Sequence, residues 1–373
     1  YKWIANVNYI IDAEPEMAGT EADVAYVAGQ AYAIRALCYL NLATWFSRAP
    51  YNSLTGASRW NEPCVPVYTT GTSIDTGGQP RESLRTVYGR IDQDIDRAIE
   101  LLEKARETTL AENNKSHINL YVALGIKSRA CLAEGDWDGA FKAAKRVIDE
   151  GGYAVGTKSD LTSGMNSLDK QNVMWGAGIQ VADQAGGYAG FFTHMDNKEG
   201  AYAKSAPKLI SKQLYNRISA TDIRRDWWDP SDKESPYVSK KFSFANVASF
   251  LGDYIYMRVE EMYFTAAEAA LRLDDLKSAR ELMNTVMAER DPGYSANNRS
   301  GTLLGATTTT WTGSFLENIL THRRIELWGE YGRLFDVRRL GQGIDRRTDD
   351  GFSEECICLL YTSPSPRDRQ KSR

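Results

Sequence analysis

The stretch AEGDWDGA, running from Ala133 to Ala140, decides the fold class. Gly135 and Asp136 predict a tight turn between two helices. Ala140 supplies the small residue at which the two helices of a pair cross in the tetratricopeptide pattern. The stretch LDDLKSA at 273–279 repeats this arrangement. Because the two stretches lie far apart, the helix pairs do not form an uninterrupted tandem array, and a non-repetitive segment is inserted between them.

Amphipathic helices extend outward from these two turns. Apolar residues recur at steps of three and four positions, which is the helical period, over residues 23–48, 83–106, 116–133, 137–150, 254–273, 276–289 and 313–330. We expect one strand at 173–180 and a short helix near 207–218. The predicted fold is mostly α, with tetratricopeptide-like helical pairs forming a scaffold, a large irregular loop-rich insertion and minor β structure.

The domain organisation follows from where regular periodicity stops. Residues 153–252 are rich in glycine, serine and aromatic side chains, and we predict that they form a loop-rich, ligand-binding insertion. The helical scaffold is expected at about 20–152 and 253–343, within a single domain of residues 1–357. Loops held on a rigid scaffold are where binding residues are usually found.

The composition excludes several classes of protein. The 373 residues are 42% hydrophobic and 25% charged, as in ordinary globular proteins. The net charge is −4, from 45 basic and 49 acidic residues, so we expect no nucleic-acid partner. No apolar run approaches the roughly 20 residues that a membrane-spanning helix needs.

The end of the chain differs from the rest. Residues 358–373, from CLLYTSPSPRD onward, resemble the in-frame translation of a sequencing-library adapter, and helical periodicity stops after Gly343. We therefore interpret 358–373 as a non-native tail and leave it out of the fold prediction. The alternative is a natural basic tail.

Three segments, in this order, resemble the SusD/RagB family of outer-membrane nutrient-binding lipoproteins from Bacteroidota. They are AGQAYAIRALCYL at 28–40, the helices and turns of 81–153, and the run 258–341 with HRRIELW at 322–328 and GRLFDVRRLG at 332–341. Together these segments cover most of residues 20–343.

The resemblance implies a function and a location. Members of the family bind oligosaccharides at the cell surface and deliver them to a SusC-like TonB-dependent outer-membrane transporter. They carry an N-terminal signal peptide and a lipid-modified cysteine, and neither is present in this sequence, so we expect a fragment truncated at both ends. The outer-membrane location and the lipid anchor are therefore implied by the resemblance alone.

Two other functions stay open at the level of sequence. One is binding of peptides, as in the RagB branch of the same family. The other is a tetratricopeptide scaffold that binds a partner protein, although the large insertion at 153–252 argues against it. Stacking platforms of aromatic rings favour sugars, whereas exposed strand edges favour peptides.

Aromatic residues in loops are the candidate ligand contacts, because flat rings stack on sugar faces and lose little entropy. The best stretch is Gly186–Phe192, where glycines let a ligand approach an aromatic loop. The predicted ligand-binding residues are Trp60, Tyr68, Tyr188, Phe191, Phe192, Trp227, Trp228 and Trp311. By contrast, Trp45, Trp137 and Trp328 lie in helices and are expected in the core.

Charged residues near the end of the scaffold are predicted to be structural. Arginines beside carboxylates form bidentate pairs that tie helix ends together, and the residues assigned this role are Arg35, Arg323, Arg324, Glu326, Asp336 and Arg338. Asp92, Asp94 and Asp96 alternate on a helix and are interpreted as a solvated face.

No catalytic constellation is found in the sequence. His-Glu-x-x-His, the P-loop, the dinucleotide fingerprint and Gly-x-Ser-x-Gly are all missing from it. Glu260 and Glu261 are adjacent on a helix and point apart, so they cannot flank one glycosidic bond. We therefore predict a protein that is not an enzyme, with no metal site and no cofactor.

Overall fold

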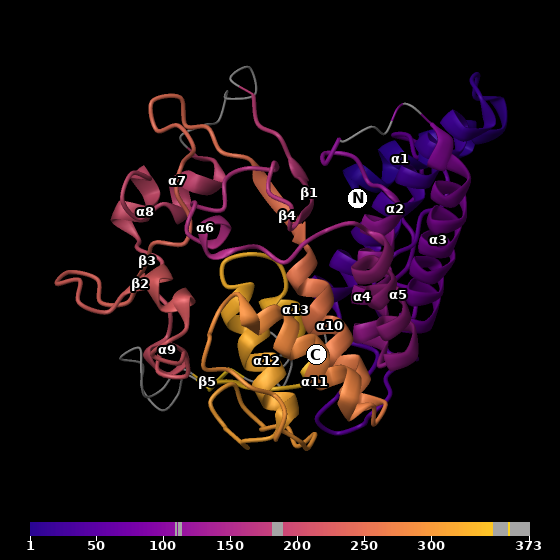
Figure 1. Ribbon diagram of the computed structural model, residues 1–373. Coiled ribbons are helices and arrows are strands. Elements are labelled where there is room, and N and C mark those ends of the chain that lie inside the picture. Colours follow the sequence, from indigo (N-terminus) through magenta and orange to yellow (C-terminus); the bar gives the residue numbers. More distant parts are fainter. Residues whose placement is uncertain (109, 111–113, 181–188, 346–356, 359–373) are drawn as a thin grey trace, which may run out of the picture.

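The computed structural model describes all residues except 109, 111–113, 181–188, 346–356 and 359–373. Long helices form a scaffold on one side of the molecule, and short helices and loops lie on the other (Figure 1). The first part of the scaffold contains α1 (Lys2–Ala13), α2 (Glu21–Phe46), α3 (Leu84–Lys104), α4 (Leu120–Glu134) and α5 (Trp137–Glu150). The second part contains α10 (Val259–Arg272), α11 (Leu276–Ala288), α12 (Phe315–Glu326) and α13 (Arg333–Leu340). A short 3-10 turn follows α1 at Glu14–Glu16, and another follows α3 at Ala105–Glu107.

The first of the two deciding turns joins α4 to α5. Gly135 adopts a left-handed conformation with φ 78°, and the carboxylate of Asp136 accepts a hydrogen bond from the backbone N–H of Gly139. One residue therefore ends α4 and the next caps α5. Ala140 is fully buried, as a small residue at a helix crossing should be.

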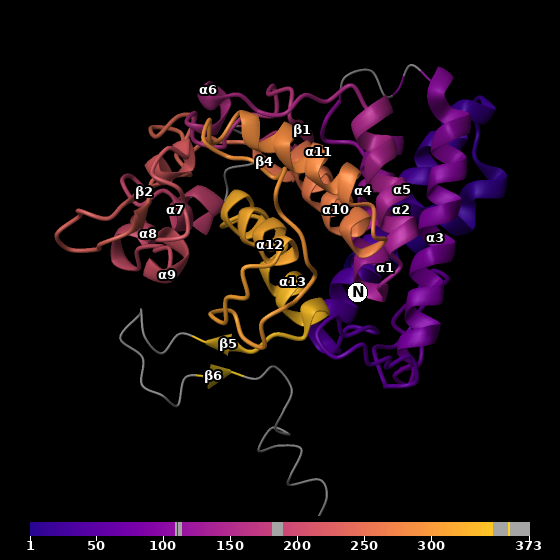
Figure 2. The same ribbon diagram turned by 60° about the horizontal axis from the view of Figure 1, so that its bottom comes forward.

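The second turn joins α10 to α11 in the same way. Asp275 caps α11 by accepting a hydrogen bond from Ser278, and Ala279 is fully buried. Helix α10 packs against α4 and α5, so the two helical pairs stack side by side despite their separation in the chain (Figures 1 and 2). The predicted tetratricopeptide-like scaffold is thus confirmed.

The insertion has its own small core. Its elements are α6 (Lys158–Leu161), β1 (Val173–Ala177), α7 (Phe191–Met195), α8 (Ala201–Ser205), α9 (Lys212–Tyr215), a 3-10 turn (Ile223–Trp227), β2 (Trp228–Asp229) and β3 (Val238–Ser239). A second hydrophobic cluster packs beneath them, separate from the core of the scaffold, and includes Leu161, Phe192, Leu214, Trp227, Trp228 and Phe242. The predicted strand and short helix are both present, although each is shorter than expected.

Strand β4 (Tyr254–Arg258) connects the insertion to the scaffold. It pairs antiparallel with β1 and runs directly into α10. The sequence analysis predicted a helix from residue 254, and this was wrong for the first five residues, because their partner strand lies about eighty positions away and local periodicity does not reveal it. Two further small sheets pair β2 with β3, and β5 (Ile344–Asp345) with β6 (Ile357–Cys358).

The two ends of the chain differ from the predicted domain organisation in what the structure describes. Helix α1 lies outside the scaffold range of 20–152 and packs along α2, so the scaffold begins earlier than predicted. Of the predicted non-native tail at 358–373, the structure describes the backbone of Cys358, which pairs with Ile344. The rest of that tail lies outside the described residues.

Two predictions about helix faces are corrected. Trp45 was expected in the core, but its side chain is 62% exposed near the end of α2. Asp94 was expected on a solvated face, but it is 1% exposed and accepts two hydrogen bonds of 2.7 Å from the guanidinium of Arg35. Which face of a helix is buried depends on the segments that pack against it, and these segments are remote in the sequence.

Buried ion pairs join the end of the scaffold to the insertion. The carboxylate of Glu326 lies within 3.0 Å of Arg224 and of Arg258, and within 2.9 Å of Arg290. These four side chains are fully buried. Breaking one partner of such a group leaves a charge without compensation, which costs about 3–5 kcal/mol.

The other charged residues that were predicted to be structural are also held by protein groups. Arg323 pairs with Asp336 at 3.0 Å. Arg324 donates to the carbonyl of Thr308 at 3.4 Å, and Arg338 donates to the carbonyl of Ser47 at 2.7 Å. These contacts fix α12 and α13 beside the segments that line the cavities described next.

Candidate functional site

A cleft with a volume of about 410 Å³ opens between the scaffold and the insertion. We call it the aromatic cleft. Its walls come from α2, α4, the β1–β4 pair, the insertion and the segment after α12, and it is lined by Leu37, Asn41, Arg129, Met165, Trp175, Phe191, Phe242, Tyr254, Ile255, Tyr256, Gly329, Glu330 and Tyr331. The volume lies in the range typical of small-molecule sites.

Aromatic rings cover most of the wall that the strands provide. The ring of Trp175 on β1 lies 5.0 Å from that of Tyr256 on β4, at an interplanar angle of 65°. Phe191 packs edge-on against Phe242, with ring centroids 5.3 Å apart, and lies 5.8 Å from Tyr254. Tyr256 is 41% exposed, so its ring is accessible to a ligand.

The charged groups of the aromatic cleft are already compensated. Arg129 donates to both carboxylate oxygens of Glu261, at 2.8 and 2.6 Å. Glu330 accepts from Arg258 and from Lys241. Burial alone would raise the pKa of Glu330, but these two cations lower it below its ordinary value, so the carboxylate stays ionised. Among the described lining residues, none therefore offers an uncompensated charge to a ligand.

Neutral hydrogen-bonding groups remain available. The hydroxyl of Tyr331 donates to Oδ1 of Asn41 at 3.4 Å. Burial raises the pKa of Tyr331 to about 12, so this hydroxyl stays protonated. Within the described part of the chain, Nδ2 of Asn41 has no hydrogen bond and can donate to a ligand oxygen. Aromatic walls with a few such groups suit a molecule with apolar faces and hydroxyl edges.

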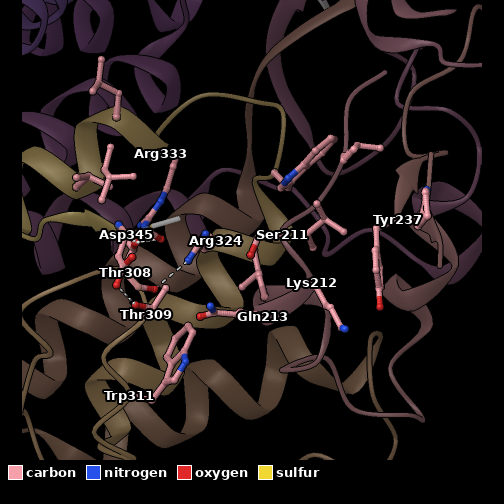
Figure 3. Close-up of a pocket in the computed structure, with 18 residues that line it drawn as sticks. Ser211, Lys212, Gln213, Tyr237, Thr308, Thr309, Trp311, Arg324, Arg333 and Asp345 are labelled. Carbon is pink, nitrogen blue, oxygen red and sulfur yellow. Dashed lines mark hydrogen bonds between the residues drawn. The ribbon is translucent and has the colours of Figure 1, made fainter. Parts of the chain in front are cut away.

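A second cavity, of about 840 Å³, lies between α9, α12 and α13. We call it the polar cavity, and Figure 3 shows it. It is lined by residues 209–214, 236, 237, 308, 309, 311, 324, 328, 333, 334, 337, 344 and 345. Its labelled side chains are mostly polar, in contrast to those of the aromatic cleft.

The structure separates the predicted ligand-binding residues. Phe191 lines the aromatic cleft, and Trp311 lines the polar cavity. Tyr68 lines a smaller pocket beside Tyr1, and Trp60 packs edge-on against Tyr88 at 5.9 Å. The described members of the set therefore do not form one site.

Three of the eight residues are core residues. Phe192, Trp227 and Trp228 are 1%, 2% and 1% exposed. A ligand cannot reach such rings, and the structure speaks against their assignment as ligand contacts. They were misassigned because a loop-rich insertion of this length needs its own core, which its aromatic residues supply. Tyr188 lies outside the described residues.

Most residues of the aromatic cleft were not predicted from the sequence. Trp175 lies in the predicted strand, and the candidates were sought in loops. Tyr254 and Tyr256 alternate along the chain, a period-two signal that places both on one face of a strand. Asn41 lies on α2 and carries no local signal, since its role depends on what packs opposite.

No group of three or more His, Cys, Asp or Glu side chains in the described part of the chain is placed to hold a metal ion. Among its helices, none combines the length and apolar character required to cross a membrane.

Comparisons with known proteins point in one direction. Two family models match, one for the SusD family over residues 195–355 and one described as starch-binding, associating with outer membrane, over residues 1–132. No curated protein matches the sequence.

Several solved structures resemble the chain. A SusD-like carbohydrate binding protein from Bacteroides vulgatus ATCC 8482 is 28% identical, with a TM-score of 0.75, and the match covers 92% of this chain and 69% of that one. A SusD superfamily protein from Bacteroides thetaiotaomicron VPI-5482 is 22% identical, with a TM-score of 0.73 over 93% of this chain and 75% of that one. Surface glycan-binding protein A from Bacteroides uniformis is 17% identical, with a TM-score of 0.63 over 90% and 71%. At these lower identities the last two support the fold alone.

Proposed function

The chain belongs to the SusD/RagB family, and from this premise we propose that it binds neutral oligosaccharides in the aromatic cleft and passes them, unaltered, to a SusC-like TonB-dependent outer-membrane transporter. One observation carries the choice of site. The aromatic cleft combines exposed rings with charges that are fully compensated, and this is the chemistry that a neutral sugar requires.

In this proposal, different residues of the aromatic cleft stack on the sugar and hydrogen-bond to it. The ring of Tyr256 supplies a platform for the apolar face of a sugar ring, and Trp175 braces it from β1. Asn41 and Tyr331 supply hydrogen bonds to hydroxyl groups at the opposite wall. Because the walls belong to both the scaffold and the insertion, a bound oligosaccharide bridges the two parts.

Binding without catalysis is supported by the carboxylates. Glycoside hydrolysis uses two carboxyl groups on either side of the scissile bond, one of them with a raised pKa. Glu330 is the carboxylate among the described lining residues, and its pKa is lowered rather than raised. It is also held by two cations and cannot act as a general acid at neutral pH.

The family description supports a location at the outer membrane. One matching family model is described as associating with the outer membrane. We therefore propose a lipoprotein on the cell surface, anchored through an N-terminal lipid, with the transporter as its partner. The RagB-type alternative, a peptide ligand, becomes an outcome of the test below.

Affinity electrophoresis through gels that contain neutral polysaccharides tests the proposal. We expect at least one polysaccharide to retard the chain, and the Tyr256→Ala variant to migrate freely. Loss of one stacking platform costs about 1 kcal/mol or more, which is roughly a five- to tenfold loss of affinity. The matched control is Tyr202→Ala on α8, where the tyrosine is 43% exposed outside the cleft.

Three results would contradict the proposal. The first is equal retardation of Tyr256→Ala and the unaltered chain. The second is release of reducing sugar during incubation, which would show catalysis. The third is binding of peptides but of no glycan, which would favour the RagB-type function.

A further inference from the structure

Within the described part of the chain, Arg333 on α13 carries a charge that no ion pair neutralises. Its guanidinium has no hydrogen bond or ion pair with any described residue. Asp336, the carboxylate that raises the pKa of Arg333, is already bound by Arg323 at 3.0 Å and by Arg339 at 2.8 Å. Arg323 and Arg339 are buried and paired, whereas Arg333 is partly exposed and faces the polar cavity.

The guanidinium of Arg333 is protonated at neutral pH. Burial lowers the pKa of Arg333 to about 10, and this value is still well above neutral pH. Desolvating a charge without a partner is unfavourable. A ligand that supplies the counter-charge would offset this cost, and the cavity in front of Arg333 gives such a ligand room.

The surroundings of Arg333 suit an oxyanion. Figure 3 shows Arg333 reaching from α13 toward the side of the cavity where Arg324, Thr308 and Asp345 lie. The hydroxyl of Thr309 donates to the carboxylate of Asp345 at 3.0 Å, and the backbone N–H of Asp345 donates to Thr308 at 3.0 Å. The one carboxylate among the described lining residues is thus engaged by a hydroxyl.

The opposite part of the polar cavity suits a sugar ring. Trp311 lines it, and the guanidinium of Arg217 covers one face of the indole ring at 3.8 Å from its centre, so a sugar ring would stack on the other face. Ser211, Gln213 and Lys212 add polar groups along the same wall (Figure 3). An aromatic ring, hydroxyl-binding groups and an unpaired guanidinium therefore surround one volume.

We propose that the polar cavity is a second saccharide site, which takes acidic sugars and pairs the guanidinium of Arg333 with their carboxylate or sulfate group. This inference rests on the proposed function in that the ligand is a saccharide. The planar fork of an arginine matches both oxyanions and forms two parallel hydrogen bonds with a carboxylate. The aromatic cleft, whose charges are compensated, has no group that would select acidic sugars over neutral ones.

Isothermal titration of the full chain at low ionic strength tests the inference with three saccharides and one ion. The saccharides are a galacturonic acid trimer, a sulfated disaccharide and a neutral trisaccharide, and the ion is inorganic sulfate. We expect at least one acidic saccharide to bind, and Arg333→Gln to weaken that binding at least tenfold. Preference between the trimer and the sulfated sugar distinguishes carboxylate from sulfate as the natural group.

Two further variants separate the site from general charge effects. Arg106→Gln, in the 3-10 turn after α3 where the side chain is 51% exposed, removes the same charge and should leave acidic-sugar binding unchanged. Arg333→Lys keeps the charge without the fork and should retain part of the affinity. Trp311→Leu gives an independent test if Arg333→Gln does not unfold cooperatively.

The outcomes separate this inference from the proposed function. If acidic sugars do not bind, or if they bind Arg333→Gln as tightly as the unaltered chain, the second site is refuted. The proposal for the aromatic cleft is not affected by that result. Inorganic sulfate that binds as tightly as the sugars overturns the saccharide part. Binding of acidic sugars without any neutral glycan binding supports the polar cavity and contradicts the aromatic cleft.

Discussion

The buried pair of Arg35 and Asp94 makes a sharp prediction about stability. Arg35 is 2% exposed and Asp94 is 1% exposed, and two hydrogen bonds of 2.7 Å join them. Arg35 also donates to Asn8 and to the carbonyl of Thr69. The Arg35→Met variant removes these contacts but keeps most of the side-chain volume, and it leaves the Asp94 carboxylate with Arg90 alone at 3.1 Å.

The expected loss follows from that geometry. Removing one partner of a buried ion pair costs about 3–5 kcal/mol, because the other charge stays buried without compensation. With an unfolding entropy of about 2.1 cal/mol/K per residue, this loss lowers the melting temperature of a chain of this size by about 4–6 °C. Differential scanning calorimetry and urea unfolding at pH 7 measure both quantities.

A surface pair provides the matched control. Arg97 is 38% exposed and pairs with Glu14 and Glu100, so Arg97→Met should cost no more than about 1 kcal/mol. Arg35→Met combined with Asp94→Leu should recover most of the loss, because no charge is then stranded. Equal effects of Arg35→Met and Arg97→Met would refute the reasoning.

Three other predictions concern acid stability, a helix turn and the reach of the binding surface. Burial alone would raise the pKa of Glu326, but three guanidinium groups lower it well below its ordinary value of 4.5. The ionised carboxylate therefore contributes its full stabilisation above about pH 4.5, and this stabilisation is lost as the pH falls toward the lowered pKa. Circular dichroism between about pH 6 and pH 2 should show the loss as acid unfolding. Gly135→Ala places a Cβ 2.7 Å from a tyrosine ring at φ 78° and should cost about 1–2 kcal/mol in urea unfolding, whereas Gly77→Ala, with nothing within 4 Å, should be neutral. Trp45→Ala, on α2 beyond the aromatic cleft, should weaken long oligosaccharides but not short ones in titration calorimetry; Trp3→Ala, 69% exposed on α1, is its control.

Local patterns in the sequence were sufficient for the scaffold. The turn at 133–140 and its repeat at 273–279 each combine a helix-ending residue, a capping aspartate and a small residue at the crossing. Each of these signals acts within a few positions, and the structure has both turns. Long helices are predicted well because their period persists over several turns.

Long-range pairing was not available from the same patterns. Residues 254–258 precede a strongly helical run, and their partner strand lies at 173–177. Asp94 alternates with two other aspartates as on a solvated face, and only the approach of Arg35 from α2 shows that it is buried. In both cases the deciding contact joins segments that are remote in the chain.

The candidate site was the least predictable part. Loop aromatics were a reasonable starting set, yet Trp227 and Trp228 form the core of the insertion. Of the predicted residues that the structure describes, Phe191 alone lines the aromatic cleft. The accessible ring of Tyr256 belongs to a strand that the sequence concealed. Burial separates a binding ring from a core ring, and burial depends on the whole fold.

A crystal structure of the chain with a retained neutral oligosaccharide would test the central claim most directly. We predict density for sugar rings in the aromatic cleft, stacked on Tyr256 at van der Waals distance and hydrogen-bonded to Asn41. Density for the ligand elsewhere on the molecule, with the cleft empty, would contradict the assignment of the site.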